Sequence, residues 1–348
     1  AILFVGDSLL RYQFDELIAW MRRRRSRVRC VTVNQPTYNG TGLAAGERRL
    51  YQELLTSDRY ERSSLDCYAH GVVLMSRRLN LLPPAHATDS SAFLSLLLSP
   101  AGKRGVAVIS VGLWYPTLAR HPSFHMRRGE RAEGVGESEG EMVGGGPRNF
   151  HRKPTSREMN PMKRGEGKRG WPAALLPRSS AAKHAKREAA RAALKSSVRS
   201  LTRLACESRG WPKLLWREGL PQHFGASGEF KKGSSCQPLR EQAARRFHSQ
   251  WVAPPLQEIA ASHSQHSCIK AVETIRSFWP LVPLHEDHTR LTNGGKGKPA
   301  DCTHWLPCSS AMYIQLQLLI GGILELGGTH DGQRNEQKQA PKRSRGVS

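Results

Sequence analysis

The sequence has 348 residues and a mass of 38.8 kDa, enough for two domains or one large domain. Its 53 Lys and Arg outnumber its 29 Asp and Glu, which gives a net charge of +24, and 38% of its residues are hydrophobic. These values exclude wholesale disorder, a collagen-like or coiled-coil rod and a disulfide-bonded miniprotein, and no apolar stretch is long enough to span a membrane.

Four short apolar runs predict strands. Most are bounded by Gly, Pro or charged residues, as is typical of strands buried on both faces of a parallel sheet. The runs are residues 1–5, 71–75, 106–111 and 214–216. The first run opens the chain without an initiator Met, so we interpret the sequence as a fragment whose missing upstream part could hold a signal or an anchor.

Apolar side chains at helical spacing predict three helices. The first helix follows residues 1–5 directly. Its apolar stripe consists of Leu10, Phe14, Leu17, Ile18 and Met21. The second helix spans Ala185 to Ala205. The third begins at Ser309 or Ser310, either of which can cap it, and ends at the two glycines after Leu326.

The remaining segments predict an interrupted single domain. Residues 126–180 mix Gly with charge and show almost no apolar periodicity, which predicts a disordered basic insert. Residues 327–348 predict a disordered basic tail. The alternation of strands and helices predicts a three-layer α/β/α sandwich with a mainly parallel sheet. We therefore expect one domain over residues 1–326, interrupted by the insert, rather than two domains.

The positive charge is concentrated in three segments. Residues 121–200 have a net charge of +10, the run from Arg22 to Arg29 contains six Arg and no acid, and residues 331–348 add +3. Such runs are usually solvated surface or disordered tail. A basic module that binds nucleic acid or another polyanion is the alternative, but these segments lack the interleaved aromatic residues that stack on bases.

A serine directly follows the first predicted strand, in Gly6-Asp7-Ser8. The C-terminal edge of a parallel strand is where α/β sheets place their active sites, and free N–H groups of the next helix can stabilise an oxyanion. Gly6 allows the chain to turn sharply. The triplet alone is weak evidence, because Asp-Ser is also an ordinary start of a helix.

Near the other end of the chain, Asp301 stands three residues before His304. A serine nucleophile needs a histidine base, and a carboxylate on the other ring nitrogen fixes the tautomer of that histidine. One loop could supply both side chains. Taken alone, such a pair is more often a surface Asp beside a solvent-facing His.

Together these segments resemble the PC-esterase family. The resemblance is carried by Gly6-Asp-Ser-Leu-Leu-Arg-Tyr-Gln13, by Leu215-Trp-Arg-Glu-Gly-Leu-Pro-Gln-His-Phe224 with the downstream Gly228 and Cys236, and by Asp301-Cys-Thr-His-Trp305. Weaker similarities are residues 111–115 and 285–288. The family includes the trichome birefringence-like polysaccharide O-acetyltransferases and belongs to the GDSL/SGNH superfamily, so the resemblance implies an SGNH-hydrolase-like fold.

The resemblance implies a role for each matching residue. Ser8 would be the nucleophile, His304 the general base and acid, and Asp301 its orienting partner. The backbone N–H of Ser8 would bind the oxyanion, together with a group near residues 110–112. Further residues expected at the oxyanion or the substrate are Gly6, Asp7, Arg11, Gly112 and His223. The alternatives are a solvated helix position for Arg11 and the packing of a loop for His223.

Two positions depart from the family pattern. The family has Asn and His where this chain has Ser110 and Leu113, which leaves the side-chain oxyanion donor in question. The family's Cys directly after His-Trp is Leu306 here. Cys308 follows two residues later, as a shifted disulfide partner or as the sign of a lost disulfide.

The seven cysteines contain no Cys-x-x-Cys pair, and His263 and His266 lie in a polar stretch without further ligands at metal-binding spacing. We therefore expect no metal and no bound cofactor. Scattered cysteines fit either buried thiols or secretory disulfides, and the glycosylation sequon Asn39-Gly-Thr41 favours disulfides. The odd count leaves one cysteine unpaired, which we expect to be Cys206.

The resemblance implies an O-acetyltransferase that passes an acetyl group through an acyl-serine to a polysaccharide hydroxyl. The acetyl donor, for which acetyl-CoA is one candidate, would be a co-substrate, and no specific nucleic acid is expected as a partner. The alternatives are a carbohydrate esterase and a non-catalytic member that binds glycans or polyanions. The family also implies the Golgi lumen, with a single-pass anchor in the part upstream of this fragment.

Overall fold

The computed structural model describes residues 1–55, 64–112, 114–120, 180–208, 211–225, 228, 235–265, 272–288 and 301–338. Residues 126–179 of the predicted insert and residues 339–348 of the predicted tail lie outside these ranges. Within them, none of the helices combines the length and the apolar character that a membrane span requires.

Seven strands in the described ranges form one sheet, in the order β2-β3-β4-β1-β5-β6-β7. The strands are β1 (Ile2–Gly6), β2 (Arg29–Thr32), β3 (Leu65–Ala69), β4 (Val72–Arg78), β5 (Val106–Ser110), β6 (Lys213–Arg217) and β7 (Val272–Ile275). The four ladders that join β4, β1, β5, β6 and β7 are parallel, whereas β3 pairs antiparallel with both β2 and β4. The prediction of an α/β protein with a mainly parallel sheet is confirmed.

The sequence predicted β1, β4, β5 and β6 but not the other three strands. Every residue of β5 is buried, so its apolar run is continuous. In contrast, β2 reads Arg-Cys-Val-Thr and β7 reads Val-Glu-Thr-Ile, and each lies at an edge of the sheet. An edge strand four residues long needs few apolar side chains, so its pattern is too weak to recognise.

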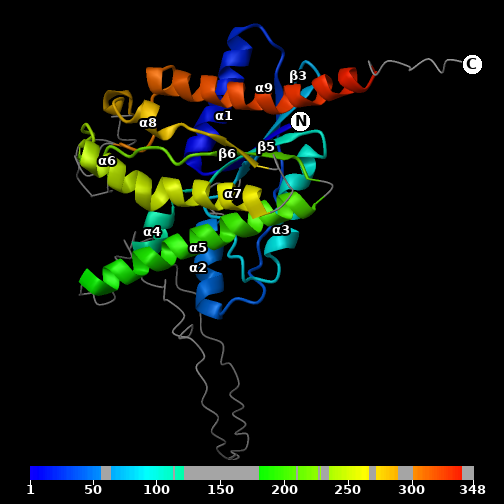
Figure 1. Cartoon of the computed structure of the whole chain (residues 1–348). Coiled ribbons are helices and arrows are strands. Elements are labelled where there is room, and N and C mark those ends of the chain that lie inside the picture. Colours follow the sequence, from blue (N-terminus) through cyan, green and yellow to red (C-terminus); the bar gives the residue numbers. More distant parts are fainter. Residues whose placement is uncertain are drawn as a thin grey trace, which may run out of the picture.

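Helices cover both faces of the sheet (Figure 1). They are α1 (Ser8–Arg23), α2 (Ala45–Leu55), α3 (Ser90–Leu98), α4 (Tyr115–Arg120), α5 (Ser180–Glu207), α6 (Glu241–Phe247), α7 (Ala253–Gln265), α8 (Phe278–Leu281) and α9 (Ser310–Lys338). The apolar sides of α1 and α9 share one core with the sheet, and α2, α3, α4, α5 and α7 share the larger core on its other face. This arrangement is compatible with a three-layer sandwich.

Helix α1 follows the predicted stripe. Leu10, Phe14 and Ile18 are buried against the sheet, and Phe14 meets Phe4 of β1 edge to face, with ring centroids 5.4 Å apart. Burial of an aromatic side chain of this kind contributes about 3–5 kcal/mol to stability, by the cost of its truncation. The packing of α1 on β1 therefore fixes the position of the β1–α1 junction.

The last helix corrects one prediction. We expected it to end at the two glycines after Leu326 and a disordered tail to follow, but α9 continues to Lys338. A glycine inside a helix costs only about 1 kcal/mol relative to alanine. The following Gln, Arg, Glu and Lys residues are good helix formers, so two glycines do not stop the helix. Similarly, Ser180, placed in the insert by the sequence, is the first residue of α5.

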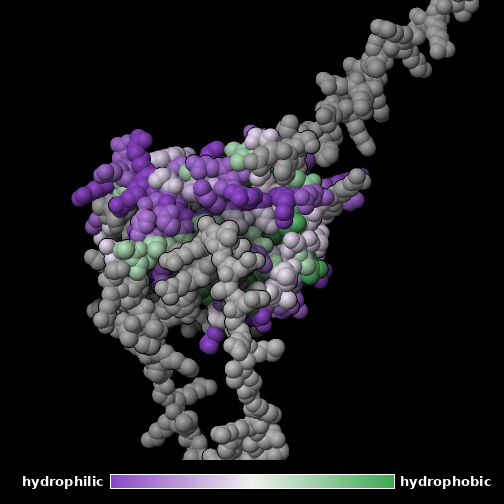
Figure 2. Space-filling model, turned by 60° about the horizontal axis from the view of Figure 1, so that its bottom comes forward, coloured by the Kyte–Doolittle hydropathy of each residue, from purple (hydrophilic) through white to green (hydrophobic). Residues whose placement is uncertain are grey.

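The surface is polar where the described residues can be seen. The face turned forward in Figure 2 is mostly hydrophilic, with hydrophobic residues only in small separate patches. The arginines from Arg22 to Arg25 at the end of α1 are exposed, as their charge predicts. This cluster therefore lies outside both cores.

Candidate active site

Ser8 lies at the carboxyl end of β1, near the middle of the sheet, and is the first residue of α1. Asp7 caps this helix, because its Oδ1 accepts a hydrogen bond of 3.0 Å from the N–H of Leu9. Strand β1 is bounded by β4 and β5 through parallel ladders. The hydroxyl of Ser8 is thus placed by regular backbone structure on both sides.

Gly6 is required by close backbone approach rather than by a special φ angle. A Cβ at this position would lie 2.5 Å from the carbonyl oxygen of Ser110 and 2.9 Å from a methyl carbon of Leu10. Gly6 and Ser110 are direct partners in the β1–β5 ladder. The absence of a side chain at Gly6 therefore lets α1 start close to β5.

The structure brings Ser8 and His304 together across 296 residues of sequence. The Nε2 atom of His304 lies 2.7 Å from Oγ of Ser8, and its Nδ1 atom lies 2.6 Å from Oδ2 of Asp301. Because the carboxylate can only accept, Nδ1–H donates to it and Nε2 is left to accept the proton of Ser8. This is the geometry that activates a serine hydroxyl as a nucleophile.

The carboxylate of Asp301 is held in its charged form. Burial raises the pKa of Asp301, but hydrogen bonds from the ring of His304 and from the N–H groups of Thr303 and His304 outweigh burial, so the pKa lies below 3.8. These two N–H groups lie 3.1 and 3.2 Å from Oδ1. Asp301 therefore orders its own loop as well as the ring of His304.

Two buried ionisable side chains, Arg217 and Asp7, lie close to the β1–α1 junction. Arg217, at the end of β6, donates from Nε and Nη2 to Oγ of Ser110 at 3.0 and 2.7 Å. Burial raises the pKa of Asp7, and the positive charges of Arg217 and Arg78 offset part of that rise. Burial also lowers the pKa of Arg217 to about 10. Asp7, at 1% exposure, supports the site from below and has no open side for a substrate.

Two further predicted site residues are Gly112, at a close approach of two backbone segments, and Arg11, in an ion pair on α1. Gly112 follows β5, and a Cβ on it would come within 3.8 Å of Gly219, so two chain segments run close together there. Arg11 forms an ion pair of 3.0 Å with Asp15 along α1. That pair corresponds to the alternative of a helix surface position. Leu113 lies outside the described residues.

Tyr12 also reaches the site, which the sequence analysis missed. Its ring centroid lies 4.8 Å from that of His304, and its side chain is 41% exposed. Residues four apart share one face of a helix, so Tyr12 follows Ser8 on the same side of α1. That spacing was the signal that could have identified it.

His223 lies in the interior of the protein, which corresponds to the alternative of loop packing. Its side chain is fully buried, with Nδ1 2.6 Å from Nε2 of His288 and Nε2 2.8 Å from the carbonyl oxygen of Val282. Because both ring nitrogens face interior partners, the ring has no atom left for a substrate. Burial lowers the pKa of His223 and of His288, because it opposes a positive charge on either ring.

The loop that carries His304 is anchored at several points. Cys302 forms a disulfide with Cys236, and its carbonyl oxygen accepts a 3.2 Å hydrogen bond from the N–H of His223. Trp305 forms a β-bridge with His288. The loop therefore depends on side-chain and isolated backbone contacts rather than on a continuous strand.

The other cysteines correct the expected pairing. Cys30 and Cys67 are joined by a disulfide between β2 and β3. Cys206, which we expected to be unpaired, is disulfide-bonded. The prediction was wrong because disulfide pairing depends on which chain segments meet in the fold. Cys206 lies in the last turn of α5, and the sequence does not show which segment that turn approaches. In the described part of the chain, Cys308 is the free cysteine, and it is exposed.

No group of three or more His, Cys, Asp or Glu side chains suited to a metal ion occurs among the described residues. His263 lies in the last turn of α7, and His266 is outside the described ranges.

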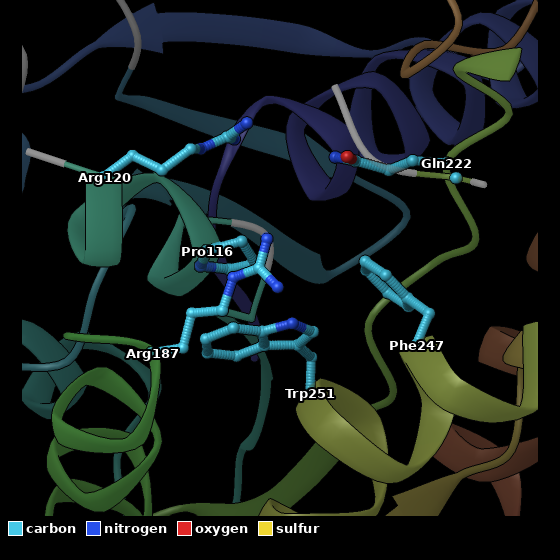
Figure 3. Close-up of a pocket in the computed structure, with 7 residues that line it drawn as sticks. Pro116, Arg120, Arg187, Gln222, Phe247 and Trp251 are labelled. Atoms are coloured by element: carbon cyan, nitrogen blue, oxygen red, sulfur yellow. The ribbon is translucent and has the colours of Figure 1, made fainter. Parts of the chain in front are cut away.

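A pocket is lined in part by residues of α4, α5 and α6 (Figure 3). It is lined by Pro116, Arg120, Arg187, Gln222, Gly228, Phe247 and Trp251. Figure 3 shows the guanidinium groups of two arginines, the rings of Phe247 and Trp251 and the amide of Gln222 turned toward one space. Such a set can hold an anionic group or stack against a ring.

Comparison of the chain with protein-family models, with curated proteins and with solved structures finds no match.

Proposed function

We propose that this chain is a serine-dependent O-acetyltransferase, with an SGNH-hydrolase-like fold, that transfers an acetyl group to a polysaccharide hydroxyl. The observation that carries the proposal is the line of contacts from Ser8 Oγ through His304 to Asp301, at 2.7 and 2.6 Å. The choice of an acetyl group, of a donor such as acetyl-CoA and of a polysaccharide acceptor comes from the resemblance to the PC-esterase family.

The reaction has two half-steps. His304 Nε2 takes the proton of Ser8 as Oγ bonds to the acyl carbon of the donor, and the leaving group then receives that proton from His304, which leaves an acetyl-serine. An acceptor hydroxyl next gives its proton to His304 and attacks the acetyl carbon, and Ser8 Oγ recovers the proton. The N–H of Ser8 at the start of α1 would stabilise each oxyanion, together with a group near Gly112.

Two further observations support a secreted or luminal setting. Disulfides join Cys30 to Cys67 and Cys236 to Cys302, and disulfides persist in oxidising compartments. Asn39 of the glycosylation sequon is exposed. A location in the Golgi lumen with an upstream anchor is part of the same proposal and rests on the family resemblance.

A fluorophosphonate probe tests the nucleophile. We expect the probe to label Ser8, and Ser8→Ala to abolish both labelling and acetyl transfer to xylan- or glucan-type oligomers. Ser91→Ala, which alters an exposed serine in the first turn of α3, is the matched control and should change neither. Unchanged transfer in Ser8→Ala would overturn the proposal, labelling with release of acetate to water alone would indicate an esterase, and binding of glycans without labelling would indicate a non-catalytic protein.

A further inference from the structure

Two buried histidines lie directly behind the loop of His304. His223 and His288 have no exposed side-chain surface. Their rings form a continuous line of contacts: Val282 O to His223 Nε2 at 2.8 Å, His223 Nδ1 to His288 Nε2 at 2.6 Å, and His288 Nδ1 to His304 O at 3.0 Å. The line therefore ends on the backbone carbonyl of the proposed catalytic base.

The number of protons in this line can be counted without assigning tautomers. The carbonyl oxygens of Val282 and His304 carry no proton, so each end contact needs an N–H from an imidazole. The contact between the rings needs one more. Three contacts require three protons, but two neutral imidazoles carry only two. With both rings neutral, one contact would set two lone pairs against each other at hydrogen-bond distance.

Some groups around the pair oppose the binding of a third proton, and others favour it. Burial opposes a positive charge, and so do His285, whose ring centroid is 6.3 Å from that of His223, and His304. The carboxylate of Asp301 favours it. The indole of Trp305 also favours it, because it stacks on His288 with ring centroids 3.9 Å apart and planes at 26°.

We propose that His223 and His288 share three protons, and hence one positive charge, and that the pair is a positioning device that holds His304 by its carbonyl oxygen. The third proton is taken up from solvent water when the protein folds, and the single shared charge opposes the uptake of a fourth. The positioning role rests on the proposed function, because holding His304 in place affects turnover only if His304 is the catalytic base. The proton count does not depend on that function.

Two substitutions test separately the shared charge of the pair and the contact of His288 with His304 O. His288→Phe keeps a ring against Trp305 but removes the N–H that reaches His304 O, so we expect turnover to fall about tenfold or more with little change in KM. His223→Asn keeps a donor for His288 Nε2 and needs no third proton, because a neutral His288 can then accept on Nε2 and donate from Nδ1. We expect this variant to keep the contact with His304 O without the shared charge, so that its turnover no longer depends on a third proton.

The test combines nitrogen NMR of histidine-labelled wild-type protein with kinetics. At neutral pH we expect three of the four ring nitrogens of the pair to carry a proton, assigned by the signals lost in each variant. As the pH rises, wild-type turnover should fall when the third proton leaves, and His223→Asn should lack that step.

Each result decides a different part of the proposal. Two protonated nitrogens would overturn the shared charge, even if neither variant folded. Unchanged turnover in folded His288→Phe, or the same pH profile in wild type and His223→Asn, would overturn the positioning role. If the fluorophosphonate probe failed to label Ser8, the proposed function would fall while the proton count remained valid.

Discussion

Ser8 and His304 face each other across 2.7 Å, but two different kinds of structure hold them. Ser8 joins a strand inside the sheet to a helix, and its position follows from backbone ladders, from the cap by Asp7 and from the missing side chain of Gly6. His304 lies in a loop without a continuous strand.

The loop of His304 is held by particular side chains. The disulfide of Cys302, the carboxylate of Asp301 and the ring of His288 each make a contact that depends on that side chain. The comparison teaches that the position of Ser8 should tolerate most side-chain changes around it, whereas the position of His304 should not. Four predictions test this difference.

Asp301→Asn should have the largest effect. The amide can no longer hold His304 in the tautomer that leaves Nε2 free, so turnover should fall about 10⁴-fold while the fold is retained. Steady-state kinetics and circular dichroism measure this. Asp287→Asn is the control in the same region, because the Oδ2 that accepts from the N–H of Ala311 can be replaced by the amide oxygen. Equal losses in the two variants would contradict the role of Asp301.

The two described disulfides should differ in what they support. Replacing Cys236 and Cys302 by Ala opens a link between residues 66 apart, and replacing Cys30 and Cys67 opens one between residues 37 apart. Chain entropy predicts a loss of roughly 4 kcal/mol in the free energy of unfolding for each. Only the first pair anchors the His304 loop, so only its loss should also lower turnover, by about tenfold or more. Urea unfolding and kinetics on both variants check this, and similar activities would remove the distinction.

Gly6→Ala should damage the Ser8 side through the backbone. The new Cβ would meet the carbonyl oxygen of Ser110 at 2.5 Å, so we expect the free energy of unfolding to fall by about 1–3 kcal/mol or more. Gly46→Ala in α2 is the matched control, since nothing lies within 4 Å of its Cβ. It should raise stability by about 0.5–1 kcal/mol. Urea unfolding of both variants decides, and a tolerated Gly6→Ala would mean that β1 and β5 can separate.

The smallest expected effect is on the pH dependence of stability, to which Asp7 and Asp301 should contribute with opposite signs. Burial raises the folded-state pKa of Asp7 above 3.8, so between pH 3.8 and that pKa the folded protein binds more protons than the unfolded chain and loses stability as the pH rises. The pKa of Asp301 lies below 3.8, so its contribution is complete above pH 3.8 and is lost as the pH falls through the folded-state pKa.

Asn substitutions remove each dependence separately. Asp7→Asn keeps an oxygen for the cap and should abolish the loss of stability on the alkaline side of pH 3.8. Asp301→Asn should abolish the loss on the acid side. Urea unfolding over a pH series measures the slope of the free energy of unfolding against pH in each variant. If both aspartates contributed slopes of the same sign, their pKa values would not be shifted in opposite directions.

The sequence was informative where structure is local or regular. The continuous apolar run of β5 and the stripe on α1 were sufficient to predict those elements, and Gly6-Asp7-Ser8 marked the β1–α1 junction. The sequence could not show that His288 faces His223, because that contact joins residues 65 apart and depends on how two loops meet. For the same reason the expectation for Cys206 was wrong. Predictions therefore held best for the half of the site that regular backbone builds.

The distance along the chain between Ser8 and His304 has a consequence for biosynthesis. During synthesis His304 is made 296 residues after Ser8. The loop of His304 also needs its contacts with His288 and Cys236, which come from other segments of the chain. A growing or partly folded chain therefore carries Ser8 without the neighbouring His304, so that on the proposed function reactivity at Ser8 would report that these two distant segments have come together.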